Sequence, residues 1–167
     1  MIVVPPRRLY PLRPHPTHEA VKASLARFLV IPAGRRSGKT ELAKRKLVKA
    51  ALSANNTPWD DPRFFAGAPT RDQAKAIFWN DLKAMIPSSL LRDVPRETDL
   101  LIPLVNGVDI HVVGMDKPQR IEGRSWDGGV LDEFANMKET AWYENVRPAL
   151  SDRRGWCWLI GVPEGRN

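Results

Sequence analysis

The feature that most constrains the fold of this chain is a short apolar run that leads directly into a glycine-containing loop. Residues 28–31 (Phe-Leu-Val-Ile) are apolar without alternation, which is typical of a strand buried on both faces. Residues 33–40 read Ala-Gly-Arg-Arg-Ser-Gly-Lys-Thr, and good helix formers follow over residues 41–54. Strand, loop and helix in this order predict a loop that binds an anion at the helix N-terminus.

This loop has the composition needed to bind a nucleoside triphosphate. Gly34 and Gly38 would let backbone N–H groups wrap the phosphate oxygens. Lys39 would reach the β- and γ-phosphates, and the Thr40 hydroxyl would bind Mg²⁺. The match to the pattern G-x-x-x-x-G-K-[ST] is imperfect, because Ala33 occupies the first glycine position. The position of the loop between a strand and a helix favours nucleotide binding over a chance match.

Two adjacent arginines make the loop unusual. Arg35 and Arg36 are either solvent-exposed charges or an additional cation beside the γ-phosphate, where charge develops in the transition state. We expect at least one of them to act in catalysis, and the choice between them stays open. The complete set expected to contact the nucleotide from the loop is Ala33, Gly34, Arg35, Arg36, Ser37, Gly38, Lys39 and Thr40.

Two carboxylates follow another apolar run, about ninety residues further on. Gly129 to Leu131 predict a buried strand that ends at Asp132 and Glu133. Ligands bind beyond the carboxyl ends of the strands in sheets of this kind. Asp132 would hold Mg²⁺, and Glu133 would act as the general base for the attacking water. The combination indicates a hydrolase, because P-loop kinases and many switch GTPases lack this glutamate.

The remaining sequence alternates between expected strands and helices. Strands are expected at 64–68, 129–131 and 156–160, helices at 17–26, 72–85 and 140–150, and a hairpin at 101–113 that turns at Asn106-Gly107. This order predicts an α/β fold with a mostly parallel central sheet, helices on both faces and one hairpin. We expect a single domain over residues 1–167, with residues 1–16 as an extended, proline-rich arm.

Composition and charge narrow the class of protein. The chain has 167 residues, of which 43% are hydrophobic and 27% charged, which excludes wholesale disorder. Cys157 is the single cysteine, which excludes an internal disulfide and a thiolate zinc cluster. The apolar runs are too short to span a bilayer, so we expect a soluble intracellular protein. The first 50 residues hold 12 of the 26 Lys and Arg but only two of the 19 Asp and Glu, which favours a phosphate-bearing partner over a merely solvated basic face.

Four segments together resemble the ATPase domain of tailed-phage large terminases, the motors that drive DNA into procapsids. They are 33–40 with its two arginines, Ala68-Pro69-Thr70, Leu131-Asp132-Glu133 and residues 161–167, in the family's order. The resemblance implies a glutamate-bearing, RecA-like P-loop NTPase that hydrolyses ATP with Mg²⁺ to translocate double-stranded DNA. It also implies neighbouring copies in a ring of five, a portal protein and a small terminase subunit as partners, and a location in the host cytoplasm with transient docking on the procapsid.

Several positions depart from the family's pattern. His18 stands where the family has a glutamine that contacts adenine, and an imidazole cannot offer the paired donor and acceptor of an amide. Val162 replaces the hydroxyl residue of the coupling motif. Arg124 is the nearest match to an arginine finger supplied to a neighbouring subunit, with Arg120 as the alternative. The family continues into a nuclease domain, for which this sequence leaves no segment, so DNA cutting is not expected.

Two other functions stay open from the sequence alone. One is another P-loop DNA translocase or helicase-like ATPase, and the other is a catalytically weak module that binds nucleotide or DNA. Trp59 and Trp126 fall in expected loops, where each could stack on a base or on a neighbouring subunit. Residues 153–154 (Arg-Arg) are expected in a solvated turn. His111 is interpreted as structural, and Cys157 as buried and inert.

Overall fold

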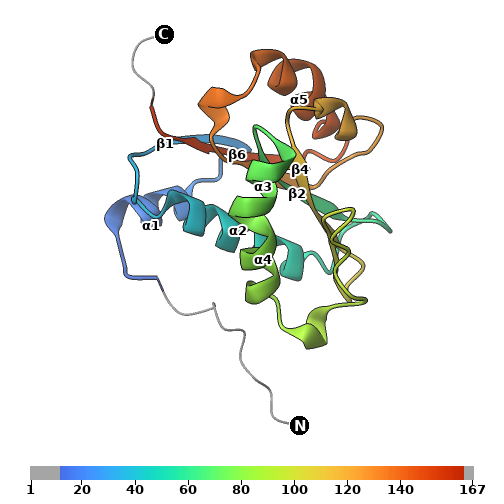
Figure 1. Cartoon of the computed structure of the whole chain (residues 1–167). Helices are drawn as coiled ribbons and strands as arrows, with labels where there is room; N and C mark the ends of the chain where they lie inside the picture. Colours follow the sequence, from blue (N-terminus) through green and yellow to red (C-terminus); the bar gives the residue numbers. More distant parts are fainter. Residues whose placement is uncertain (1–11, 164–167) are drawn as a thin grey trace.

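A six-stranded sheet forms the centre of the protein, with the strands in the order β1-β6-β5-β2-β4-β3 (Figure 1). The structure is a computed structural model that describes residues 12–163, so most of the expected N-terminal arm and the last four residues of the 161–167 motif lie outside it. The strands are β1 Phe28–Pro32, β2 Arg63–Ala68, β3 Leu101–Pro103, β4 Asp109–Gly114, β5 Gly128–Leu131 and β6 Trp156–Gly161.

The pairing of the strands confirms the expected α/β architecture. Neighbouring strands are parallel throughout, except that β3 and β4 form the predicted antiparallel hairpin. The turn of this hairpin contains Gly107 with a φ of 87°, a left-handed angle that glycine adopts without strain. β1, the strand that feeds the glycine-containing loop, lies at one edge of the sheet, and Val30 on it is 62% exposed.

Helices cover both faces of the sheet (Figure 1). α2 and α4 lie on one face, and the segment of α5 lies on the other. Side chains alternate along β2, so that Phe64 joins the core beneath α2 whereas Phe65 joins the core on the opposite face. The helical segments are α1 Pro16–Ala23, α2 Lys39–Ser53, α3 Arg71–Ala74, η1 Lys75–Trp79, α4 Asn80–Met85, η2 Ser88–Leu90, η3 Pro118–Arg120, η4 Phe134–Asn136, η5 Ala141–Val146 and α5 Arg147–Ala149.

The two glycines at the start of β5 are required by close packing. A Cβ on Gly129 would lie 2.4 Å from the Phe65 ring, and one on Gly128 would lie 2.4 Å from the Trp156 ring. Large rings on the strands to either side therefore fill the space that side chains on β5 would take. This packing holds β5, and the acidic residues that follow it, close to both neighbouring strands.

Three helices differ in detail from their expected form. The helix expected over 140–150 consists of η5, which is π-helical over Ala141–Val146, and α5. α1 begins at Pro16 rather than at residue 17, because the His15 ring accepts a hydrogen bond from the Thr17 N–H and caps the helix. The helix expected over 72–85 is continuous but changes to π-helical geometry at η1, between α3 and α4. Its start is fixed by Thr70, whose side chain forms a reciprocal capping box with Gln73.

Trp126 is a core residue and not the exposed stacking platform that its expected loop position allowed. Its side chain is 1% exposed and packs edge-on against the Phe65 ring, with centroids 5.5 Å apart. The indole N–H donates to the Ile121 carbonyl at 3.0 Å. The loop before β5 therefore contributes a large buried ring to the hydrophobic core on the Phe65 face of the sheet.

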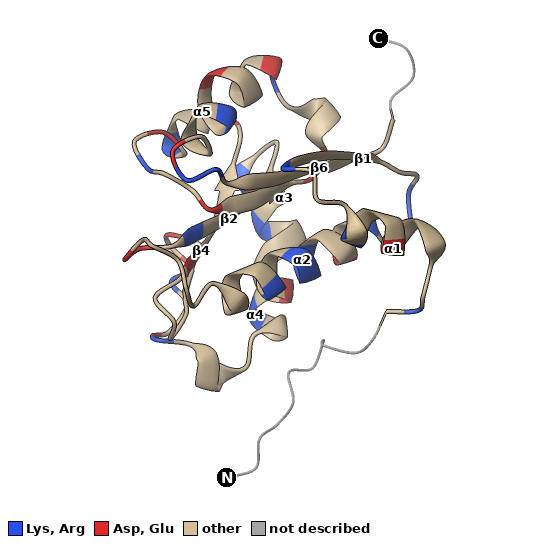
Figure 2. Cartoon of the chain, turned by 180° about the vertical axis from the view of Figure 1, so that it is seen from behind, with Lys and Arg blue, Asp and Glu red and all other residues tan. Residues whose placement is uncertain are grey.

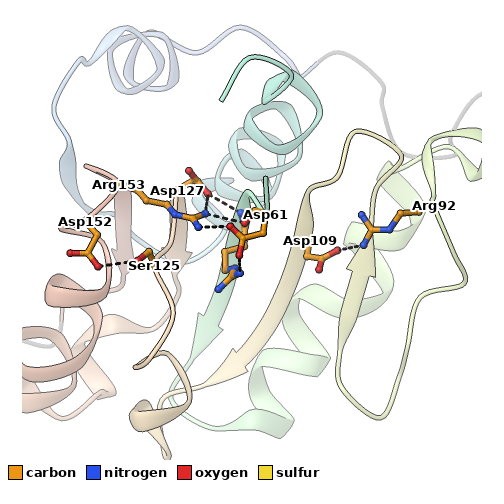
Figure 3. Close-up of polar contacts among 8 residues, drawn as sticks. Asp61, Arg92, Asp109, Ser125, Asp127, Asp152 and Arg153 are labelled. Carbon is orange, nitrogen blue, oxygen red and sulfur yellow. Dashed lines mark hydrogen bonds and ion pairs between the residues drawn. The ribbon is translucent and has the colours of Figure 1, made fainter. Parts of the chain in front are cut away.

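Arg153 is also misplaced by the sequence prediction of a solvated turn. Its side chain is 8% exposed and bridges Asp61 and Asp127, with 3.0 Å between its Nη1 and Asp127 Oδ2 (Figure 3). Asp127 also accepts the backbone N–H of Arg63 at 2.8 Å. The hydrogen bond from Arg153 holds the pKa of Asp61 below its usual value. This cluster ties the amino ends of β2 and β5 together.

None of the helices in the described part of the chain combines the length and the apolar character needed to cross a bilayer.

Candidate nucleotide-binding site

The carboxyl ends of the parallel strands meet at one edge of the sheet, where the loop 33–38 and the acidic pair come together. The Ala33 N–H donates to the Gly161 carbonyl at 3.0 Å, which ties the loop after β1 to the end of β6. The Asp132 N–H donates to the Gly67 carbonyl at 2.9 Å, which ties the end of β5 to β2. These bonds fix the starting points of the segments that carry the site.

The loop that leads into α2 is shaped by two left-handed residues. Gly38 caps α2 with a φ of 78°, and its carbonyl accepts the Leu42 N–H at 2.9 Å. The other left-handed residue is Arg36, with a φ of 62°. Gly34, which we expected to need such an angle, has none, and a Cβ there would meet nothing within 4 Å. The left-handed backbone angles of this loop are therefore at Arg36 and Gly38.

The Thr40 hydroxyl and the Asp132 carboxylate are in direct contact. Thr40 Oγ1 donates to Asp132 Oδ2 at 2.7 Å, across 92 positions of sequence. Asp132 is 4% exposed, and its other oxygen accepts the Glu133 N–H at 2.8 Å. The two residues that the sequence assigned to one Mg²⁺ are thus brought together.

A cavity of about 440 Å³ opens above this contact. The loop, α2, the helix η1–α4 and the end of β5 form its walls. It is lined by Arg35, Arg36, Lys39, Thr40, Lys44, Ala76, Ile77, Asp81, Asp132, Glu133 and Val162. The charged residues are thus four cations and three carboxylates, which suits a phosphate chain together with a divalent cation.

The loop cations are available to a ligand. Arg35 and Arg36 are exposed, and neither has an ion pair within residues 12–163. Lys39 Nζ donates to the Gly34 carbonyl at 3.3 Å, which folds the lysine back over its own loop. All three side chains line the cavity, so the positions predicted from sequence do converge on one space.

Glu133 lines the cavity and has a left-handed backbone conformation. Its φ of 53° is left-handed, and the residue starts the short helix η4. A non-glycine residue at such an angle carries strain, and strain of this kind gathers at functional sites. The Glu133 side chain is exposed and lines the cavity.

His18 contacts the loop rather than an open base site. Its Nε2 lies 2.9 Å from the Ser37 carbonyl, and its ring is 3.1 Å from where a Cβ on Gly38 would stand. Among the described residues, His18 Nδ1 and Ser37 Oγ are buried without a hydrogen-bond partner. The imidazole therefore supports the loop from α1, and Val162 lines the cavity with an apolar side chain where the family's pattern has a hydroxyl.

Arg120 and Arg124 lie away from this cavity. They line a separate cavity of about 870 Å³ together with Arg71 and Arg96. His111 also faces this second cavity, and burial, the largest cause, lowers its pKa to about 4. Neither candidate finger can therefore be counted among the groups around the Thr40–Asp132 contact of its own chain.

Two residues of the site were missed by the sequence analysis. Lys44 and Asp81 line the cavity, and Lys44 Nζ donates to Asp81 Oδ2 at 2.6 Å. A signal for Lys44 existed, because it lies four residues after Thr40 and so on the same side of the helix. No comparable signal marks Asp81, which reaches the site from a different helix.

The oxygen donors present fit a magnesium ion. Within residues 12–163 no group of three or more His, Cys, Asp and Glu is arranged to hold a metal on its own. Magnesium is instead commonly held by one or two protein oxygens together with substrate phosphates. Thr40 Oγ1 and Asp132 Oδ2 supply such a pair.

Comparisons with known proteins show which family this chain resembles along most of its length. Residues 30–157 match a family model described as the N-terminal part of terminase large subunits of the T4-like type. The terminase large subunit of Thermus phage G20c is 30% identical over 173 residues, which cover 93% of this chain and 35% of that protein. The chain thus spans about a third of the length of this curated relative.

Solved structures of large terminases are also similar to this chain. The ATPase domain of the large terminase of Thermus phage P74-26 is similar with a TM-score of 0.71 and 26% identity, covering 93% of this chain and 67% of that one. The large terminase of a thermophilic bacteriophage, solved in complex with ADP, is similar with a TM-score of 0.62 and 19% identity, covering 81% of this chain and 33% of that one. The second likeness shows the fold alone.

Proposed function

This chain belongs to the terminase large-subunit family, and from that premise we propose that it hydrolyses ATP to move double-stranded DNA. The observation that carries the proposal is the 2.7 Å contact between Thr40 and Asp132, within one cavity that also holds Lys39 and Glu133. A hydrolase needs a phosphate-binding loop and a base at one place, and here both face the same space.

The chain's own residues bind and orient the triphosphate. The positive end of the α2 helix dipole, at its N-terminus, points at the phosphates. Lys39 turns from the Gly34 carbonyl to the oxygens of the β- and γ-phosphates. Thr40 and Asp132 would hold Mg²⁺, which would neutralise charge on those oxygens. His18 keeps the Ser37 segment of the loop in place from α1.

Glu133 provides the base for hydrolysis. The carboxylate takes a proton from the water whose oxygen attacks the γ-phosphorus, and the bond from that phosphorus to the ADP oxygen breaks. Arg35 or Arg36 stabilises the charge that develops on the transferred group. The products are ADP and inorganic phosphate, and the proton on Glu133 returns to solvent.

A neighbouring copy completes the site in this proposal. Arg124, with Arg120 as the alternative, would act on the nucleotide of the next subunit, because both lie in the second cavity of their own chain. The second cavity and the basic residues along α2 (Figure 2) offer positive charge to DNA phosphates, so DNA binding would be independent of sequence and sensitive to salt. The portal protein and the small terminase subunit are further partners that the family suggests.

Phosphate release from Mg-ATP, measured over a range of protein concentrations, tests the proposal. Turnover that rises faster than linearly with concentration is expected, since a shared site needs two copies. Glu133→Ala should lower turnover by about 10²–10⁴-fold and leave nucleotide affinity unchanged. Glu139→Ala, an exposed glutamate on the following segment, is the matched control and should leave turnover unchanged.

Mixing two inactive variants separates the shared site from a self-contained one. A mixture of Glu133→Ala and Arg124→Ala should regain part of the turnover, because some interfaces then combine an intact glutamate with an intact arginine. Arg120→Ala replaces Arg124→Ala in a parallel mixture to choose between the two. Phosphate release at background with ATP still bound would instead identify a nucleotide-binding module, and stronger stimulation by single-stranded than by duplex DNA would identify a helicase-like enzyme.

A further inference from the structure

Lys44 and Asp81 form an ion pair inside the nucleotide cavity that the mechanism above does not use. Lys44 is 6% exposed, and its Nζ lies 2.6 Å from Asp81 Oδ2 and 5.9 Å from the centre of the Phe78 ring. The Asp81 side chain retains 31% exposure and lines the same cavity as Asp132 and Glu133. The pair connects α2, which begins at the phosphate loop, with α4.

Folding energetics give a weak reason for such a pair. The free energy needed to remove two charges from water is about as large as the free energy gained from their attraction. Apolar residues of similar volume therefore often stabilise the folded state equally well. Neighbouring positions on both helices are in fact apolar and buried, including Leu47 and Leu82. The position of the pair in the wall of the cavity is therefore the feature that needs an explanation.

The same face of α2 makes two polar contacts, one turn apart. Thr40 holds the end of β5 through Asp132, and Lys44 holds α4 through Asp81. α4 follows directly on the π-helical segment η1, which contributes Ala76 and Ile77 to the cavity wall. The η1 segment is held in the core by Phe78 and Trp79, and the Lys44–Asp81 pair adds a polar contact between this wall and α2.

We propose that Asp81 is a positioning residue for ATP hydrolysis, which acts through Lys44 to hold the η1–α4 wall at a fixed place in the cavity that Glu133 also lines. The proposal rests on the proposed function. The loop and α2 would bind the phosphates, whereas this wall shares the cavity with Glu133, the proposed base for the attacking water. Small displacements of reacting groups lower rates strongly, so loss of the pair should reduce turnover more than affinity.

Steady-state turnover and KM for ATP, nucleotide affinity and the thermal midpoint form the test. Asp81→Asn should lower kcat about 10- to 100-fold, with KM and the affinity for a fluorescent ATP analogue changed less than about threefold. The double variant Lys44→Met with Asp81→Leu should recover the thermal midpoint of the wild type but not its kcat. Lys44→Arg keeps a charge-assisted hydrogen bond to the Asp81 carboxylate and should retain kcat within about threefold.

A second ion pair, made by the continuous helix that contains η1 and α4, serves as the matched control. Lys75 in η1 contacts Glu97 at 2.6 Å, the same length as the cavity pair, but both side chains are exposed. Glu97→Gln breaks this pair outside the cavity and should leave kcat and KM unchanged.

Each outcome supports or overturns the proposal. Wild-type kcat in the apolar double variant would show that the pair is only structural, and a rise in KM that accounts for the whole loss would show that Lys44 is a direct phosphate ligand. If Asp81→Asn fails to fold, the double variant and Lys44→Arg still decide between these readings. Absence of turnover in the wild type would defeat the proposed function itself, a result distinct from an active wild type with an equally active Asp81→Asn.

Discussion

The two ends of the central strands differ in how their charged residues are satisfied. At the amino ends of β2 and β5, Arg153 is buried between Asp61 and Asp127, and the protein provides all of its partners (Figure 3). At the carboxyl ends, Arg35 and Arg36 are exposed and have no ion pair within residues 12–163. At one end the protein provides the partners of the buried arginine, and at the other these two arginines are exposed to a ligand.

This difference separates stability from activity along the same strands. Charges that already have protein partners contribute to folding and gain nothing from a ligand. Charges without partners repel one another in the absence of a ligand and attract phosphate when it arrives. We therefore expect substitutions at the amino ends to change the free energy of unfolding, and those at the carboxyl ends to change nucleotide binding and turnover.

The largest expected effect is at the carboxyl end. Lys39→Ala should weaken ATP binding by about 10- to 100-fold, because it removes a charged hydrogen bond to phosphate worth about 1.5–3 kcal/mol. The free energy of unfolding should stay close to that of the wild type, since the described contact of Lys39 is a single bond of 3.3 Å to the Gly34 carbonyl. Isothermal titration and a urea titration measure the two quantities. Unchanged affinity would break the comparison.

The next effect is at the amino end. Arg153→Met should lower the free energy of unfolding by about 2–3 kcal/mol, because it leaves the Asp127 carboxylate without its charged donor. Turnover per folded molecule should not change. Arg154→Met is the matched control, because Arg154 is the next residue and its side chain is exposed. The left-handed φ of 51° at this position is unfavourable for Arg and for Met alike, so the substitution does not change that cost. A similar loss in both variants would show that the ion pairs contribute little.

The smallest expected effect concerns His111, in the second cavity. Burial lowers its pKa from 6.5 to about 4, opposed by the carboxylate of Asp109 and reinforced by three guanidiniums, those of Arg124, Arg63 and Arg96. Below pH 6.5 the unfolded chain therefore binds a proton that the folded chain takes up only near pH 4. This contribution to stability is complete above pH 6.5 and is lost as the pH falls toward 4.

His111→Asn should make the thermal midpoint less dependent on pH between 6.5 and 4 than in the wild type. The variant also loses the edge-on contact of the imidazole with Trp126, so a uniform decrease is expected at all pH values. The difference in slope, rather than in height, is the measured quantity. Equal slopes in the two proteins would contradict the assignment of a neutral His111 in the folded protein.

Local patterns predicted most of the fold because they depend on neighbouring residues. The apolar runs became β1, β2, β5 and β6, and Asn106-Gly107 became the hairpin turn. The parallel arrangement then brought Lys39 and Asp132 to the same edge, since the carboxyl ends of parallel strands lie together. The sequence was therefore sufficient for the strands of the sheet, for the position of the main helices and for the centre of the candidate site.

Contacts between distant segments were not predictable in the same way. Arg153 meets Asp61 across 92 positions, and Lys44 meets Asp81 across 37, with no periodic signal to link them. Trp126 does lie in a loop as expected, but its burial was not predictable because it depends on the Phe65 ring of β2. The π-helical turn at η1 likewise has no marker in its composition, which is that of an ordinary helix.

The left-handed backbone at Glu133 has a consequence for how this protein can be altered. A glycine there would adopt the φ of 53° freely and release roughly 1–2 kcal/mol of conformational strain. Engineering aimed only at heat resistance would thus favour Glu133→Gly and discard the proposed catalytic base. At this position a more stable fold and the proposed hydrolysis are competing goals.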